Sequence, residues 1–161
     1  MLREKLLASM VDYLCKKYNN MELNINEIKE YLSNRHPYLL VDRVTDLKPG
    51  VSAKAYKNLT ANEWYFPVHF PEEPMMPGMI QMEALLQTLS LTVLSMEGNK
   101  GRIVRNLYAN KIRLKKRVTP GNRLDIEADL ISFEGDIATG CAKGFIDGEP
   151  ACEGEFKFKL I

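Results

Sequence analysis

Residues 75–96 read MMPGMIQMEALLQTLSLTVLSM, and this stretch decides the fold. Apolar side chains fall on nearly every face from Gly78 to about Met96, so a helix here must be covered by other structure on most sides. Pro77 suits the first turn of that helix, because its fixed φ is already helical and its missing N–H is not needed there. A membrane span is not expected, because Glu83 would place a carboxylate near the centre of the bilayer. The stretch therefore predicts a long buried helix of a soluble protein.

Most of the remaining chain reads as strands separated by turns. Alternating or apolar runs bounded by proline, glycine or asparagine are typical of strands. They predict strands over 38–41, 51–59, 102–118, 123–133, 136–147 and 151–160. One long apolar helix beside an antiparallel sheet is an α+β layer architecture.

The first twenty residues are expected to form a separate unit. An apolar residue recurs at every fourth position, at Leu2, Leu6, Met10 and Leu14. This period predicts an amphipathic helix. We therefore expect residues 1–20 to be an N-terminal helical extension and residues 21–161 to be a single domain. A short second helix follows, capped by Asn24 or Asn26.

Composition and charge narrow the class of protein. The 161 residues are 45% hydrophobic and 27% charged, which suits one globular domain. A net charge of +1 gives no bulk attraction to polyanions, and the basic residues follow no nucleic-acid-binding pattern. The three cysteines are too scattered for a disulfide framework or a metal site. Because the N-terminus lacks the apolar core of a signal peptide, we expect a cytoplasmic protein without a metal.

His69 is the first candidate catalytic residue. Residues 61–78 hold four prolines, and each proline fixes φ, so the loop that carries His69 is irregular but stiff. Val68 and Phe70 flank the imidazole and help to exclude water. An imidazole titrates near neutrality, which suits proton transfer. Taken alone, however, a histidine in an aromatic loop is more often structural.

Glu83 is the second candidate. It lies in the second turn of the apolar helix, where no wide polar face receives it, and desolvation there favours the protonated acid. Gln87, one turn further on the same face, is placed to orient that carboxyl by a hydrogen bond. Gly78 and Met79 offer free backbone N–H groups to a thioester oxygen that gains charge. Together these groups suit removal of a proton next to a carbonyl and departure of a hydroxyl.

The chain resembles a known family in the order and spacing of these residues. It is similar to the FabZ-type 3-hydroxyacyl-(acyl carrier protein) dehydratases of fatty-acid synthesis at His69-Phe70-Pro71-x-x-Pro74-x-Met76-Pro77-Gly78-x-x-x-x-Glu83-Ala84-x-x-Gln87. Flanking blocks agree as well, at Leu39 to Val44, Lys111-x-Arg113 and Val118-x-Pro120-Gly121. The resemblance covers about residues 21–161.

The resemblance implies a hotdog fold, in which a curved antiparallel sheet wraps a long helix. It implies a homodimer, with a hexamer built as a trimer of dimers as the larger alternative, and an active site at the dimer interface. His69 of one subunit would take the C2 proton, and Glu83 of the other would protonate the 3-hydroxyl. We expect the substrate to be bound by Phe70, Gly78, Met79 and Gln87. The substrate would be a (3R)-hydroxyacyl thioester on the phosphopantetheine arm of acyl carrier protein, so no separate cofactor is required.

An acidic carrier protein needs a basic docking surface. We expect this surface at Arg102, Arg105, Lys111, Arg113, Lys115 and Lys116. Alternating charges on exposed strands often serve only solubility, so this assignment has a plainer alternative. Two other functions also stay open at this point. One is a hotdog acyl thioesterase, which uses a helix carboxylate with a water nucleophile, and the other is a non-catalytic hotdog assembly subunit.

Overall fold

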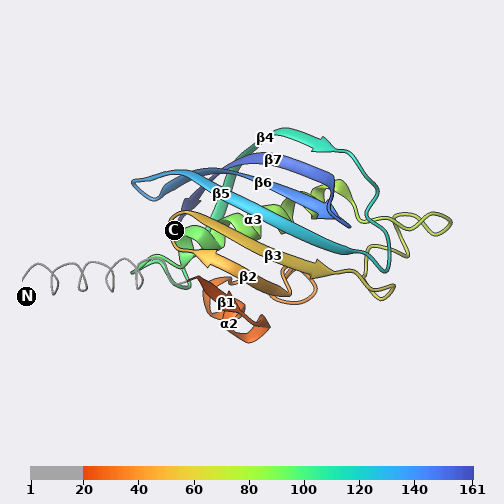
Figure 1. Cartoon of the computed structure of the whole chain (residues 1–161), viewed down its shortest axis with the longest axis horizontal. Helices are drawn as coiled ribbons and strands as arrows, with labels where there is room; N and C mark the ends of the chain where they lie inside the picture. The colour runs from red at the N-terminus through yellow and green to blue at the C-terminus, as the bar shows by residue number, and fades with distance from the viewer. Residues whose placement is uncertain (1–19) are drawn as a thin grey trace, which may run out of the picture.

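Seven strands and two helices make up the part of the chain that the structure, a computed structural model, describes: residues 20–161 (Figure 1). The helices are α2 (Ile25–Tyr31) and α3 (Gly78–Leu94), and the strands are β1 (Met21–Leu23), β2 (Arg43–Lys48), β3 (Ser52–Asn58), β4 (Val104–Leu114), β5 (Arg123–Glu134), β6 (Ile137–Ile146) and β7 (Glu149–Leu160). All strands form one antiparallel sheet in the order β1-β2-β3-β5-β6-β7-β4. The sheet curves around α3, which packs against β3, β5, β6 and β7. This arrangement confirms the predicted α+β class.

α3 is the buried centre of the sheet's concave face. Every residue from Ile80 to Leu94 is buried except Glu83, as the apolar stretch predicted. The buried hydroxyls are satisfied within the helix, since Thr88 donates to the carbonyl oxygen of Ala84 at 3.0 Å. A helix covered in this way gives Glu83 a rigid backbone.

β6 lies very close to α3 because Gly140 has no side chain. A Cβ at Gly140 would stand 2.6 Å from a methyl carbon of Leu89 on α3 and 2.6 Å from the backbone oxygen of Asp129 on β5. Both distances are well inside van der Waals contact. Glycine therefore sets the spacing between the helix and the middle of the sheet.

Five of the six predicted strands are present. Segments 51–59, 102–118, 123–133, 136–147 and 151–160 correspond to β3, β4, β5, β6 and β7. The predicted strand over 38–41 is wrong, because this segment is a loop that precedes β2. Its apolar run reflects burial of Leu40 and Val41 in the core. The backbone of Tyr38 and Leu40 bonds to the side chain of Gln87 instead of to a neighbouring strand.

The N-terminal end of the described chain contains one predicted cap. The side chain of Asn24 accepts from the N–H groups of Asn26 and Glu27, and Glu27 returns a bond to the N–H of Asn24, which together make a capping box. The helix predicted over 1–20 lies outside the described residues apart from Asn20, so the division into an extension and a single domain stays a prediction. Between residues 20 and 161, no helix is long and apolar enough to cross a membrane.

Candidate active site

His69 is held in one orientation by the loop that carries it. Its Nδ1 atom lies 3.0 Å from the carbonyl oxygen of Met75. Because a carbonyl oxygen only accepts, Nδ1 must carry a proton, so in the neutral ring the lone pair lies on Nε2. The ring also stacks on Phe70, with ring centroids 4.3 Å apart. The loop thus fixes the ring and engages Nδ1, so that Nε2 is the nitrogen left available to act as a base.

Backbone hydrogen bonds fasten both ends of this loop to the sheet side of the molecule. Before His69, the N–H of Leu59 donates to the carbonyl oxygen of Asn122 at 3.0 Å. After it, the N–H of Met76 donates to the carbonyl oxygen of Val118 at 2.7 Å. Met75 accepts the hydrogen bond from Nδ1 of His69. It directly precedes Met76, whose backbone is fastened to Val118.

Glu83 is oriented by Gln87, and the predicted hydrogen bond between them is present. The Gln87 Nε2 atom donates to Glu83 Oε1 at 2.9 Å and to the carbonyl oxygen of Tyr38 at 2.9 Å. Its Oε1 accepts from the N–H of Leu40 at 2.8 Å. The Leu40 N–H can only donate, so the amide of Gln87 has one possible orientation. Burial raises the pKa of Tyr38, and the nearby charge of Glu83 adds to that rise.

Within one chain, His69 and Glu83 lie in different hollows. His69 lines a hollow of about 380 Å³ together with Gly78, Gln81 and Leu114. Glu83 lines a smaller hollow of about 100 Å³, whose walls include Gln87, Asn34, Val104 and Asn106. A single subunit therefore does not bring the two groups into one hollow.

The start of α3 contributes to the hollow that contains His69. The N–H groups of Gly78 and Met79 precede the first intrahelical bonds, which begin with Ile80 and Gln81 donating to the carbonyl oxygen of Pro77. Gly78 lines the hollow, and a Cβ there would stand 2.3 Å from a methyl carbon of Leu114. Met79, which is 70% exposed, and Phe70 are not among the residues that line it.

Gln81 was missed as a site residue by the reasoning from sequence. It is buried, lines the hollow of His69, and donates from Nε2 to the carbonyl oxygen of Met76 at 3.0 Å. Its Oε1 has no hydrogen-bond partner among the described residues. A polar residue in an apolar helix was the available signal, and the same signal pointed to Glu83.

The six cations expected to form a docking surface are spread along and beside β4. Lys115 and Lys116 line the hollow of His69, whereas Lys111 and Arg113 line a separate hollow next to β6 and β7. Arg102 lies at the opposite end of β4, where it pairs with Asp136 at 2.8 Å, and Arg105 stands across from Lys159 on β7.

No group of His, Cys, Asp or Glu side chains between residues 20 and 161 is arranged to hold a metal ion.

Carboxylates neutralise most of these cations. Lys111 pairs with Glu155, both Arg113 and Lys115 pair with Glu153, and Lys116 pairs with Glu149. Hydrogen bonds to Lys115 and Lys116 lower the pKa values of Glu153 and Glu149. The surface along β4 is thus a mixture of both charges.

Residues 32–155 match the family model described as a FabA-like domain, which defines the class of this protein. Curated relatives narrow that class. A 3-hydroxyacyl-(acyl-carrier-protein) dehydratase FabZ of Clostridium botulinum (strain Eklund 17B / Type B) is 44% identical over 140 residues, which are 86% of this chain and 99% of the relative. The FabZ of strain Hall is 46% identical over 138 residues, which are 86% and 96% of the two chains. The chain belongs to the FabZ family of dehydratases.

Solved structures share the fold at low sequence identity. The dehydratase heterocomplex ApeI:P from Xenorhabdus doucetiae has a TM-score of 0.70 at 15% identity, over 83% of this chain and 90% of that one. An uncharacterized protein from Pyrococcus horikoshii has a TM-score of 0.60 at 17% identity, over 82% and 92%. These likenesses confirm the hotdog fold. Membership of the FabZ family then favours the lyase over the acyl thioesterase and the non-catalytic subunit.

Proposed function

We propose that this protein dehydrates (3R)-hydroxyacyl thioesters on acyl carrier protein to trans-2-enoyl thioesters, with His69 as the base and Glu83 as the acid. The observation that carries the proposal is the bond from Nδ1 of His69 to the Met75 carbonyl oxygen, which leaves Nε2 free. In the reaction, Nε2 takes the proton from C2, and the electron pair becomes the C2–C3 double bond as the C3–O bond breaks. Glu83 gives its proton to the departing hydroxyl, which leaves as water. One proton then passes from His69 to Glu83 through solvent and restores both groups.

The start of α3 suits the charge that develops on the thioester oxygen. The N–H groups of Gly78 and Met79 lie at the positive end of the helix, and Gly78 lines the hollow of His69. Donors that are fixed in place before the reaction stabilise an enolate-like oxygen without further reorganisation.

A homodimer would bring the two hollows together, and β4 supports this part of the proposal. β4 is the last strand of the sheet, and its exposed apolar side chains include Leu107, Tyr108 and Ile112. Val104 and Asn106 at its start line the hollow of Glu83, and Leu114 at its end lines the hollow of His69. Two β4 strands that pair antiparallel would set each His69 end beside the partner's Glu83 end. A hexamer built from such dimers stays a prediction.

The hollow that contains His69 suits the phosphate of a phosphopantetheine arm. Lys115 and Lys116, two of the six cations expected to dock the carrier, line this hollow together with Arg117. The carboxylates paired with these cations lower the net charge, so we expect modest binding that depends on salt concentration. We place the enzyme in the cytoplasm, with acyl carrier protein as its partner.

Mixed dimers test the shared site directly. His69→Ala and Glu83→Gln should each lower kcat by about 10³-fold while the protein stays folded. In a dimer of one copy of each variant, one site loses both groups and the other keeps both. Random mixing should therefore restore about one quarter of the parent activity. Absorbance of the enoyl product measures the activity, and assays for free thiol exclude a thioesterase. No recovery on mixing, with each variant alone inactive, would contradict a site shared between subunits.

A further inference from the structure

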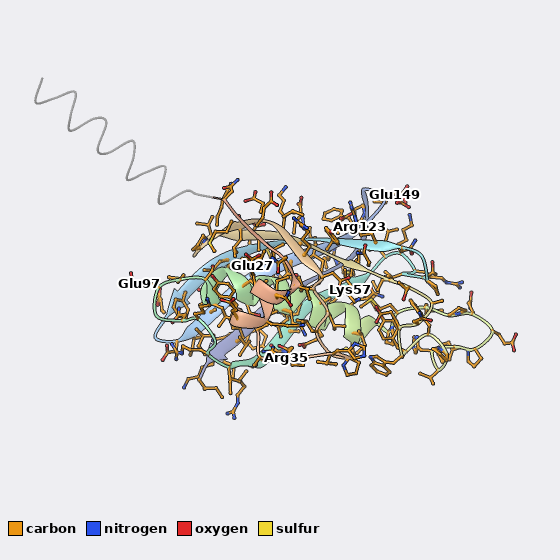
Figure 2. All side chains as sticks on the ribbon, turned by 90° about the horizontal axis from the view of Figure 1, so that it is seen from below. Glu27, Arg35, Lys57, Glu97, Arg123 and Glu149 are labelled. Atoms are coloured by element: carbon orange, nitrogen blue, oxygen red, sulfur yellow. The ribbon has the colours of Figure 1, made fainter. Side chains whose placement is uncertain are left out.

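Lys57 is the one charged residue among residues 20–161 that is buried, with 7% of its surface exposed (labelled in Figure 2). Its ammonium lies 2.6 Å from Glu63 Oε1, 3.0 Å from the carbonyl oxygen of Asn58 and 3.4 Å from the carboxylate of Asp42. Asp42 also accepts the N–H of Asn58 at 2.7 Å. One ammonium thus joins the segment before β2, the end of β3 and the loop that leads to His69.

Stability alone is a poor explanation for this cluster. The desolvation of buried charges cancels much of their attraction, and apolar replacements of similar size are often as stable. What a buried ion pair does provide is one allowed position for each partner. The partner that the cluster fixes here is Glu63, six positions before His69.

A continuous run of turns connects Glu63 with His69. The N–H of Phe66 donates to the carbonyl oxygen of Glu63, and the N–H of Val68 donates to the carbonyl oxygen of Tyr65, both at 3.2 Å. Tyr65 and Phe66 are buried and pack edge to face. Burial raises the pKa of Tyr65, with smaller contributions from the charges of Glu63 and Asp42, so these side chains lie close together. A displacement of Glu63 would therefore move the backbone that carries His69.

We propose that Lys57 is a positioning residue for His69: through Glu63 it sets the start of the His69 loop, and so keeps Nδ1 of His69 in reach of the Met75 carbonyl. The inference rests on the proposed role of His69 as the base. Met75 is fastened through Met76 to Val118, and the approach to His69 is fastened through Glu63 to Lys57. The bond between His69 and Met75 spans the two anchors, so it is the contact that breaks when either anchor moves.

Lys57→Met and Lys54→Met are a matched pair for the test. Both lysines lie on β3, and Lys54 pairs with Glu127 at 2.9 Å, but that pair is about half exposed. In Lys57→Met, kcat for a carrier-linked 3-hydroxyacyl substrate should fall about 30-fold, while KM stays within about threefold. Lys54→Met should leave both values unchanged. Glu63→Gln keeps one carboxylate for the ammonium, so it should fold even where Lys57→Met does not, and its kcat should fall about fivefold.

The imidazole signals of the protein separate positioning from a general loss of structure. The chain has only two histidines, His36 and His69, so nitrogen-15 spectra of labelled histidine resolve them, and His69→Ala assigns them. In the parent, His69 should show the tautomer with the proton on Nδ1. In Lys57→Met and Glu63→Gln it should show a mixture of both tautomers. Unchanged His69 signals in these variants would overturn the proposal even if activity fell. Changed signals with a normal kcat would support the positioning of His69 but refute its role as the base.

Discussion

The two proposed catalytic groups are held by different kinds of structure. Glu83 projects from α3, whose residues before and after it in the sequence are buried. Gln87, which orients Glu83, lies on the same helix. His69 lies in an irregular loop that is fixed by backbone hydrogen bonds and by the buried ammonium of Lys57. Packing therefore places the acid, and a small number of polar contacts place the base. Substitutions in the helix should cost stability and activity together, whereas substitutions that loosen the loop should cost mainly activity.

The largest effect on the helix side should come from Gln87→Met. This change removes the amide that serves Glu83, the Tyr38 carbonyl and the Leu40 N–H, and it leaves the Leu40 N–H buried without a partner. The free energy of unfolding should fall by about 3 kcal/mol, and kcat by about 100-fold. Denaturant titration and the enoyl absorbance assay measure the two values.

Thr88→Val is the control for that change. Thr88 is equally buried on α3, but its hydroxyl bonds only to the carbonyl oxygen of Ala84 within the helix. Its loss should cost about 1 kcal/mol and leave kcat unchanged. Equal losses of activity in the two variants would mean that Gln87 has no special role in orienting Glu83.

Gly140→Ala should give the next largest effect, on stability alone. The added methyl would stand 2.6 Å from the backbone oxygen of Asp129, which cannot move without distorting β5. The free energy of unfolding should fall by about 2 kcal/mol, while kcat per folded molecule stays normal. Gly154→Ala, whose nearest contact would be 3.1 Å from the ring of Phe156, should cost less. A loss of kcat in Gly140→Ala at full folding would show that the sheet spacing also controls the active site.

The sequence predicted the helix side of the site better than the loop side. The apolar period of α3 and the turn-bounded strands are local patterns, so they predicted the helix and five strands of the sheet. The contact between Glu83 and Gln87 was predictable because helical geometry brings residues four apart onto one face. The cluster around Lys57 was not, because Asp42, Lys57 and Glu63 meet only after β2 and β3 have paired. The error at 38–41 has a similar cause, since an apolar run reports burial and does not say which polar group will satisfy its backbone.

The ion pair that holds the His69 loop on the surface should matter much less than the buried ion pair between Lys57 and Glu63. Glu73 follows His69 and pairs with Arg117 on the surface, with both side chains more than half exposed. Because solvent screens such a pair, Glu73→Gln should change the free energy of unfolding by less than about 1 kcal/mol and kcat by less than about twofold. If Glu73→Gln lowered kcat as much as Glu63→Gln, the loop would be held from outside, and the contrast with the buried ammonium would fail.

The smallest effect should come from the exposed pair of Lys116 and Glu149, and its dependence on pH gives its sign. The hydrogen bond from Lys116, and then its charge, lowers the pKa of Glu149 below the ordinary value of 4.5. A carboxyl whose pKa is lowered by folding stabilises the folded state above its unfolded pKa, and this contribution disappears as the pH falls through the folded value. Lys116→Gln should therefore unfold at a slightly lower denaturant concentration than the parent near pH 7. The difference between the two midpoints should begin to shrink as the pH falls below about 4.5, and it should vanish once the pH lies below the lowered pKa of folded Glu149. A difference that persisted or grew in acid would mean that Lys116 stabilises the fold through some contact other than its ion pair with Glu149.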